Sequence, residues 1–144
     1  MVNDKRACLH ICVTCRRDNR QSEPEAAEPV PGRLLHDAVA GLLDRGPNSS
    51  GLEVQPVICL ANCDRGCSAI LSAPGKWAYM VGGLGPEHAA DVIAYGEAYA
   101  ASETGTVLRA GRPPSLRHAI LGRFPPSIAD AAWTAATSRK EAAE

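Results

Sequence analysis

Apolar and polar residues alternate in the first predicted strand, residues 5–13. Leu9, Ile11 and Val13 occupy every second position, which is the period that separates the two faces of a β-sheet. Three more strands are predicted from apolar stretches at residues 52–60, 68–72 and 77–81. Pro56 has no backbone N–H to donate, so we expect the second strand at an edge of the sheet or at an irregular position.

Two segments carry apolar residues at helical spacing. In residues 33–45 the apolar side chains fall on one face, and the Gly-Pro pair that follows ends the helix. A second helix is predicted from residue 86 to about residue 101, and it begins with Pro86 and Glu87, which are favoured in a first turn. The order β-α-β-β-β-α predicts a small α/β fold with a four-stranded mixed sheet and flanking helices.

The last third of the chain has a different character. Residues 104–126 hold four arginines and no acidic residue, and two proline pairs bracket a short piece, residues 115–122, that we predict to be helical. A final alanine-rich helix is predicted at residues 128–141. We therefore divide the chain into one domain, residues 1–103, and a basic, proline-containing, helical or irregular C-terminal extension, residues 104–144.

Composition narrows the possible functions. The net charge of −1 gives no general attraction to nucleic acid or membranes, and no apolar run approaches the roughly 18 residues of a membrane span. The charged start, residues 1–6, is not followed by a long apolar stretch, so we expect no signal peptide and a cytoplasmic location. In that reducing compartment, the six cysteines indicate metal or redox chemistry rather than a disulfide framework.

Five of the cysteines fall into two groups, one after the first predicted strand and one after the second. The groups are Cys12 with Cys15, and Cys59, Cys63 and Cys67, which recur every four residues. We expect the two groups to meet in space and to hold one metal centre. Four thiolates satisfy Zn²⁺ and equally fill the terminal sites of a [2Fe-2S] cluster. The sixth cysteine, Cys8, is predicted to be a small core residue.

The spacing leaves the identity of the metal open. Neither Cys12 and Cys15 nor Cys59 and Cys63 have a glycine between them, which disfavours a zinc knuckle without excluding zinc. A thiol oxidoreductase that uses Cys12 and Cys15 is a further alternative, although this pair does not open a helix that would lower a thiol pKa. The four histidines are scattered along the sequence. We therefore expect a carrier or metal-binding protein rather than an enzyme.

The segment 59–79 resembles the second half of the thioredoxin-like [2Fe-2S] ferredoxins. Both show Cys-Leu-x-x-Cys, an acidic-Arg-Gly step, an apolar strand, a Pro-Gly turn, and Trp and Tyr. Residues 9–12, Leu-His-Ile-Cys, resemble the first strand of these ferredoxins, which ends in the first ligand. The resemblance implies a thioredoxin-like fold, single-electron transfer, and a [2Fe-2S] cluster whose ligands include Cys12, Cys59 and Cys63.

The fourth ligand is less directly indicated by this resemblance. Residues 16–58 contain no cysteine, so Cys15 is the nearest residue that could replace the second ligand of the ferredoxins. Cys67 stands where those ferredoxins often have proline, and it is a fifth candidate ligand.

Nearly the whole chain resembles a family of small bacterial proteins described as predicted metal-binding and often encoded near cobalamin-synthesis genes. The shared features are Cys-x-Thr-Cys, the triple-cysteine loop, the Pro-Gly-Lys hairpin, and residues 101–105 and 123–126. This resemblance implies an alternative function, a zinc- or cobalt-type metal-binding or metal-delivery protein that serves cofactor biosynthesis.

Three arginines near the cysteine groups favour a protein partner. Arg16, Arg17 and Arg65 would raise the reduction potential of a cluster and could steer an acidic redox or metal-acceptor protein. We expect neither a nucleic acid nor a membrane as a partner, and the sequence leaves open whether the chain forms a homodimer.

Overall fold

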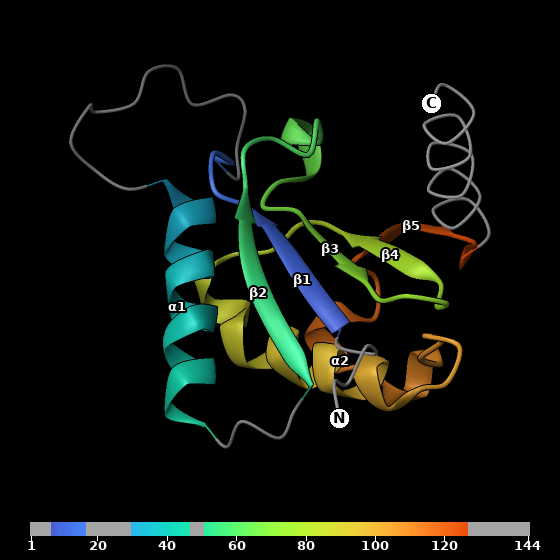
Figure 1. Cartoon of the computed structure of the whole chain (residues 1–144). Helices are drawn as coiled ribbons and strands as arrows, with labels where there is room; N and C mark the ends of the chain where they lie inside the picture. Colours follow the sequence, from blue (N-terminus) through green and yellow to red (C-terminus); the bar gives the residue numbers. More distant parts are fainter. Residues whose placement is uncertain (1–6, 17–29, 47–50, 127–144) are drawn as a thin grey trace, which may run out of the picture.

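The computed structural model describes residues 7–16, 30–46 and 51–126, apart from the side chain of Cys63. Within these ranges the chain forms one five-stranded sheet and two α-helices (Figure 1). The strands are β1 (Ala7–Cys12), β2 (Leu52–Val57), β3 (Ala69–Ser72), β4 (Ala78–Val81) and β5 (Ile120–Phe124). The helices are α1 (Pro31–Arg45) and α2 (Ala89–Ala101), and the single 3₁₀ turns are η1 (Cys63–Arg65), η2 (Pro86–His88), η3 (Arg109–Gly111) and η4 (Pro114–Leu116).

The sheet has the order β2-β1-β3-β4-β5. β1 and β2 are parallel, and the other neighbouring strands are antiparallel. Two parallel strands need a crossover connection, which α1 supplies. The predicted edge position of the strand that contains Pro56 is confirmed, because β2 pairs only with β1 in the described part of the chain. β2 ends at Val57 rather than at residue 60.

The sheet has one strand more than the sequence predicted. Residues 115–122 were expected to be helical, and that prediction is wrong. In this segment the helical part is limited to the 3₁₀ turn Pro114–Leu116. Ile120–Phe124 instead forms a strand that pairs with the outer edge of β4. Pairing satisfies backbone groups of β4 that would otherwise lack partners at this edge, so tertiary context overrides a weak local signal. The helix predicted at 128–141 lies outside the described residues.

The core lies on the face of the sheet that α1 and α2 cover. Ala7, Leu9 and Ile11 of β1 are completely buried there, whereas the alternating residues Cys8 and His10 are half-buried on the opposite face. Cys8 is therefore not part of the main apolar core, contrary to expectation. No helix among the described residues has the length and apolar content that crossing a bilayer requires.

Three tyrosines form the aromatic part of the core. Tyr79 of β4 meets Tyr95 and Tyr99 of α2 edge-on, with ring centroids 6.5 and 6.2 Å apart. Burial raises the pKa of Tyr95 and the pKa of Tyr99 to about 12. In the unfolded chain a tyrosine has a pKa near 10, so the folded state holds these two protons more tightly.

Alkaline solution is expected to unfold the protein between pH 10 and pH 12. Below pH 10 both states keep the phenol protons, and the stabilisation is complete. Above pH 10 the unfolded chain loses its phenol protons first. By pH 12 the free energy of unfolding therefore falls by roughly 2–3 kcal/mol for each tyrosine. Urea denaturation at several pH values measures this loss. Tyr95→Phe should remove one of the two contributions to this loss. If the free energy of unfolding of the variant fell with pH as steeply as that of the wild type, the assignment to Tyr95 would be contradicted.

Candidate metal centre

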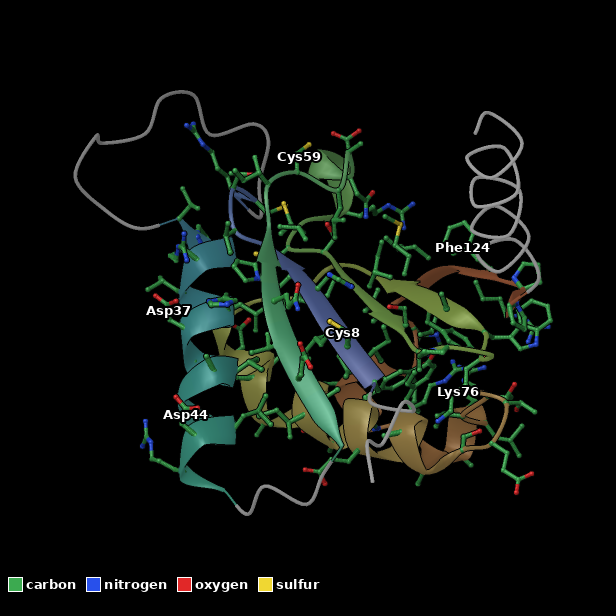
Figure 2. All side chains as sticks on the ribbon, in the orientation of Figure 1. Cys8, Asp37, Asp44, Cys59, Lys76 and Phe124 are labelled. Atoms are coloured by element: carbon green, nitrogen blue, oxygen red, sulfur yellow. The ribbon has the colours of Figure 1, made fainter. Side chains whose placement is uncertain are left out.

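The two cysteine groups leave the sheet at the same end. Because β1 and β2 are parallel, their carboxyl ends lie side by side, with Cys12 opposite Val57. The amide of Val13 continues this pairing and donates to the carbonyl oxygen of Val57 at 3.0 Å. Cys59 follows Val57 by two residues, and Figure 2 shows it at the end of β2, in the loop that leads to η1.

The sulfur of Cys12 contacts the backbone of the second cysteine group. Cys12 is only 4% exposed, and burial alone would raise the pKa of its thiol. Hydrogen bonds from the side chain and amide of Thr14 and from the amides of Leu60 and Cys59 act in the opposite direction, and together they hold the pKa of Cys12 below the ordinary value for a thiol. Such amides stabilise a thiolate, which is the form that binds metal. Residues far apart in sequence thus share one sulfur environment.

Cys59 is exposed and lies in a tight turn. Its backbone has φ = 69°, and Ala61 has φ = 55°, both in the left-handed region that residues other than glycine rarely adopt. The amide of Ala61 donates to the Sγ atom of Cys59 at 3.2 Å. The turn therefore keeps the Cys59 sulfur close to its own backbone. Cys63 begins η1, and its side chain is not among those that the structure describes.

Replacing Ala61 with glycine should stabilise the metal-free protein by about 1 kcal/mol. The left-handed conformation costs alanine roughly this amount, whereas glycine adopts it freely. The matched control is Ala94→Gly at an exposed position in α2, where glycine should destabilise the helix by about 1 kcal/mol. Chemical denaturation measures both changes, and a loss of stability in Ala61→Gly would contradict the described turn.

Cys15 lies against the beginning of α1. The amide of Gly32 donates to the carbonyl oxygen of Cys15 at 3.0 Å, and a side chain at position 32 would meet the Cys12 carbonyl oxygen at 2.1 Å. The partial positive charge of a helix N-terminus favours nearby thiolates. The Cys12–Cys15 pair does not open a helix in sequence, but the fold brings a helix start to it. Cys15 is 4% exposed.

Cys67 belongs to the apolar core. It is completely buried, and its backbone exchanges two hydrogen bonds of 3.0 Å with Leu84, which is also completely buried. Its predicted role as a fifth ligand stays a prediction.

Charged residues near the two groups are accessible. Arg16 and Arg65 are exposed, and so is Asp64 beside Arg65. Arg17 lies outside the described residues.

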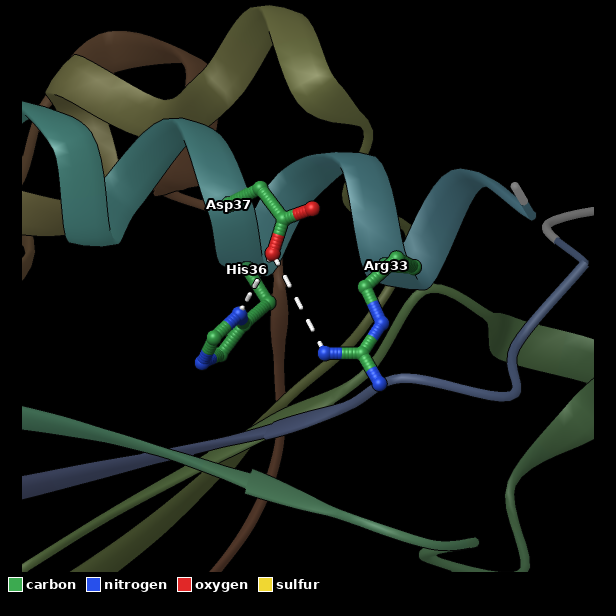
Figure 3. Close-up of polar contacts among 3 residues, drawn as sticks. All are labelled: Arg33, His36 and Asp37. Carbon is green, nitrogen blue, oxygen red and sulfur yellow. Dashed lines mark hydrogen bonds and ion pairs between the residues drawn. The ribbon is translucent and has the colours of Figure 1, made fainter.

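Two of the histidines have partners that suit structural roles. Nδ1 of His36 lies 2.9 Å from the carboxylate of Asp37, which is also 4.0 Å from the guanidinium of Arg33 (Figure 3). Nδ1 of His88 accepts the amide of Gly85 at 2.9 Å and so satisfies the turn before α2. Both contacts are local, between residues one and three apart in the sequence.

The residues at this end of the sheet fit a sulfur-rich metal centre. Among the side chains that the structure describes, which exclude that of Cys63, no three histidine, cysteine or acidic side chains are grouped around one point. The fit instead rests on soft thiol donors in adjoining loops and on two buried hydrogen-bond donors in the second of these loops. Asn62 Nδ2 and Ser68 Oγ are buried and have no partner among the described residues. The sequence does not indicate either residue, because whether a polar side chain is buried without a hydrogen-bond partner depends on the folded structure.

The fold of this chain is thioredoxin-like. A thioredoxin-like [2Fe-2S] ferredoxin from Aquifex aeolicus has a similar structure, with a TM-score of 0.52, 16% sequence identity, and coverage of 85% of this chain and 96% of that chain. A cysteine-to-serine variant of the ferredoxin from the same organism gives a TM-score of 0.51 and 13% identity, with coverage of 81% and 98%. The predicted thioredoxin-like α/β fold is thus confirmed, with five strands instead of four.

Residues 9–126 match the family described as Protein of unknown function (DUF1636). The chain therefore belongs to the DUF1636 family. No curated protein matches it.

Proposed function

We propose that this protein binds a [2Fe-2S] cluster and carries single electrons to a partner protein. Cys12, Cys15, Cys59 and Cys63 are the proposed ligands. The observation that carries the proposal is the contact between the Cys12 sulfur and the amides of Cys59 and Leu60. This contact supports the proposal, because it brings Cys12 and the backbone of the second cysteine group together at one end of the sheet.

The surrounding residues have definable roles in this proposal. The chemistry that such a cluster supplies when bound is the uptake and release of one electron. The amides of Thr14, Cys59 and Leu60 donate to the Cys12 sulfur and favour its thiolate form. Donors of this kind stabilise added negative charge on sulfur and so raise a reduction potential. Cys12 and Cys15 are each only 4% exposed, so the protein keeps water away from these two proposed ligands.

Anaerobic purification with metal and sulfide analysis tests this proposal. We expect a brown protein that contains two irons and two sulfides per chain, as a [2Fe-2S] cluster requires, with visible absorption that dithionite bleaches. A colourless protein with one tightly held zinc would contradict the proposal and support the alternative below.

The second candidate is a metal-delivery protein that holds zinc or cobalt and serves cobalamin synthesis. Its link to that pathway rests on the family resemblance. The exposure of Cys59 favours it, because an accessible ligand is available to a receiving protein. Transfer of zinc or cobalt to an acceptor, without visible iron-sulfur absorption, would distinguish this candidate from an electron carrier.

An acidic redox or metal-acceptor protein is the proposed partner for either function. Ile58 is 81% exposed directly before Cys59, and Arg16 and Arg65 are exposed in the two cysteine loops. We propose that these residues, with Arg17, form the docking surface, in which the arginines accelerate encounter with acidic groups. The cytoplasm suits this role, because it keeps thiols reduced.

A further inference from the structure

Two unused hydrogen-bond donors lie within the loop that carries the second cysteine group. Among the described residues, three buried side-chain nitrogen or oxygen atoms lack a hydrogen-bond partner. One of them, the hydroxyl of Tyr95, lies beside the guanidinium of Arg112, whose charge acts on it. The other two are Asn62 Nδ2 and Ser68 Oγ. Buried polar groups normally have partners, so each exception calls for an explanation.

Ser68 is the cross-strand neighbour of Cys12. The antiparallel register of β1 and β3 places Ile11 opposite Ala69, so the next step places Cys12 opposite Ser68. The amide of Cys12 donates to the carbonyl oxygen of Ser68 at 3.1 Å, which continues this pairing. Side chains that oppose each other in an antiparallel pair lie on the same face, with Cβ atoms about 5 Å apart. The side chains of Ser68 and Cys12 therefore lie on the same face of the sheet, on neighbouring strands, and Ser68 is completely buried.

Asn62 lies between two proposed ligands. It connects the turn at Cys59 to η1, and its carbonyl oxygen accepts the amide of Arg65 at 3.1 Å. Its buried side-chain nitrogen has no acceptor among the residues that the structure describes. An amide NH₂ group and a hydroxyl group can both donate. Each of these two groups can therefore donate a hydrogen bond to an electron-rich acceptor.

We propose that the Ser68 hydroxyl and the Asn62 amide donate hydrogen bonds to the sulfur atoms of a metal centre that Cys12 helps to hold. This inference rests on the proposed thiolate centre and names two of its positioning residues. Thiolate and sulfide sulfurs in such a centre carry negative charge and accept hydrogen bonds. Partners outside the ligand set orient the ligands and retain the metal. They also raise the reduction potential of an iron-sulfur cluster.

The inference predicts opposite effects of one substitution on the metal-free and metal-loaded states. In the metal-free protein, Ser68→Ala removes a buried hydroxyl that has no partner, so the midpoint of chemical denaturation should rise. In the metal-loaded protein, the same change removes a hydrogen bond, so the metal should be held about tenfold or more weakly. A serine with a merely structural role would not produce this reversal.

The experiment compares Ser68→Ala with Ser72→Ala. Ser72 is the last residue of β3, the strand that begins directly after Ser68, and it lies on the same face, opposite Cys8, and is half-buried. Full-length protein is titrated with Co²⁺, whose absorption reports thiolate ligands, and is separately reconstituted with iron and sulfide for a redox titration. We expect weaker Co²⁺ binding and a lower reduction potential for Ser68→Ala, and wild-type values for Ser72→Ala. Asn62→Ala, in the loop, gives an independent second test.

The outcomes separate this inference from the proposed function. If no iron-sulfur cluster forms but Co²⁺ binds to thiols, and Ser68→Ala weakens that binding, the electron-carrier proposal falls and the inference stands. If both variants at positions 62 and 68 bind Co²⁺ and the cluster as the wild type does, the inference is overturned. A lower denaturation midpoint for metal-free Ser68→Ala overturns it as well. If the wild type binds neither probe through cysteine, the inference falls with the proposed function.

Discussion

Cys12→Ala should abolish metal binding while leaving the chain folded. Cys12 is the residue at which the two cysteine groups touch, because its sulfur receives hydrogen bonds from the amides of Cys59 and Leu60. Loss of a direct ligand should reduce metal affinity by at least about tenfold, since even partners outside the ligand set contribute that much. The metal content of anaerobically purified protein measures the effect.

Cys8→Ala is the matched control for this substitution. Cys8 lies on the same strand and on the same face of the sheet, and it is half-buried. It pairs with Ser72 and Glu53, away from the end at which Cys12 meets the second group. We expect Cys8→Ala to keep the wild-type metal content. Equal metal content in both variants would exclude Cys12 as a ligand.

Gly32→Ala should destabilise the protein by about 3 kcal/mol and impair metal binding. A Cβ atom at this position would lie 2.1 Å from the carbonyl oxygen of Cys12 and 3.1 Å from the amide nitrogen of Cys15. Both contacts are with backbone, which cannot move aside without displacing α1 or the first cysteine group. Urea denaturation and metal analysis measure the two effects.

Gly41→Ala tests whether this effect belongs to the position or to glycine replacement in α1. The nearest atom to a Cβ at position 41 is the flexible end of Arg45, at 3.3 Å. Alanine has the higher helix propensity, so this variant should gain up to about 1 kcal/mol. Wild-type stability and metal content in Gly32→Ala would show that α1 does not begin against the Cys12–Cys15 segment.

The sequence was sufficient for the parts of the fold that have a strong local pattern. Alternation in β1 and the apolar face of α1 predicted both elements, and Pro56 correctly indicated an edge strand. β5 was missed because its residues do not alternate regularly between apolar and polar and have some helix-like features. Gly122 also interrupts its apolar run. What makes it a strand is the open edge of β4, which is a property of the folded sheet.

The candidate site was predictable in its residue types but not in its surroundings. Clustered cysteines at the ends of two predicted strands led to the expectation that Cys12 and Cys59 approach each other. The contacts of Gly32 and Ser68 with the first group follow from register and helix placement, for which the sequence has no local signal. The complete burial of Cys67 and the pairing of its backbone with Leu84 likewise have no local signal in the sequence.

Protection of Cys59 from alkylation tests most directly whether the two cysteine groups share one centre. Cys59 is exposed, so iodoacetamide should modify it readily when no metal is bound. In anaerobically purified wild-type protein, native mass spectrometry should show bound iron and sulfide, with Cys59 protected until a chelator removes them. Cys12→Ala, a change in the other group, should abolish that protection. Metal-loaded protein in which Cys59 is modified as fast as in the metal-free chain, or is protected equally in Cys12→Ala, would contradict a shared centre.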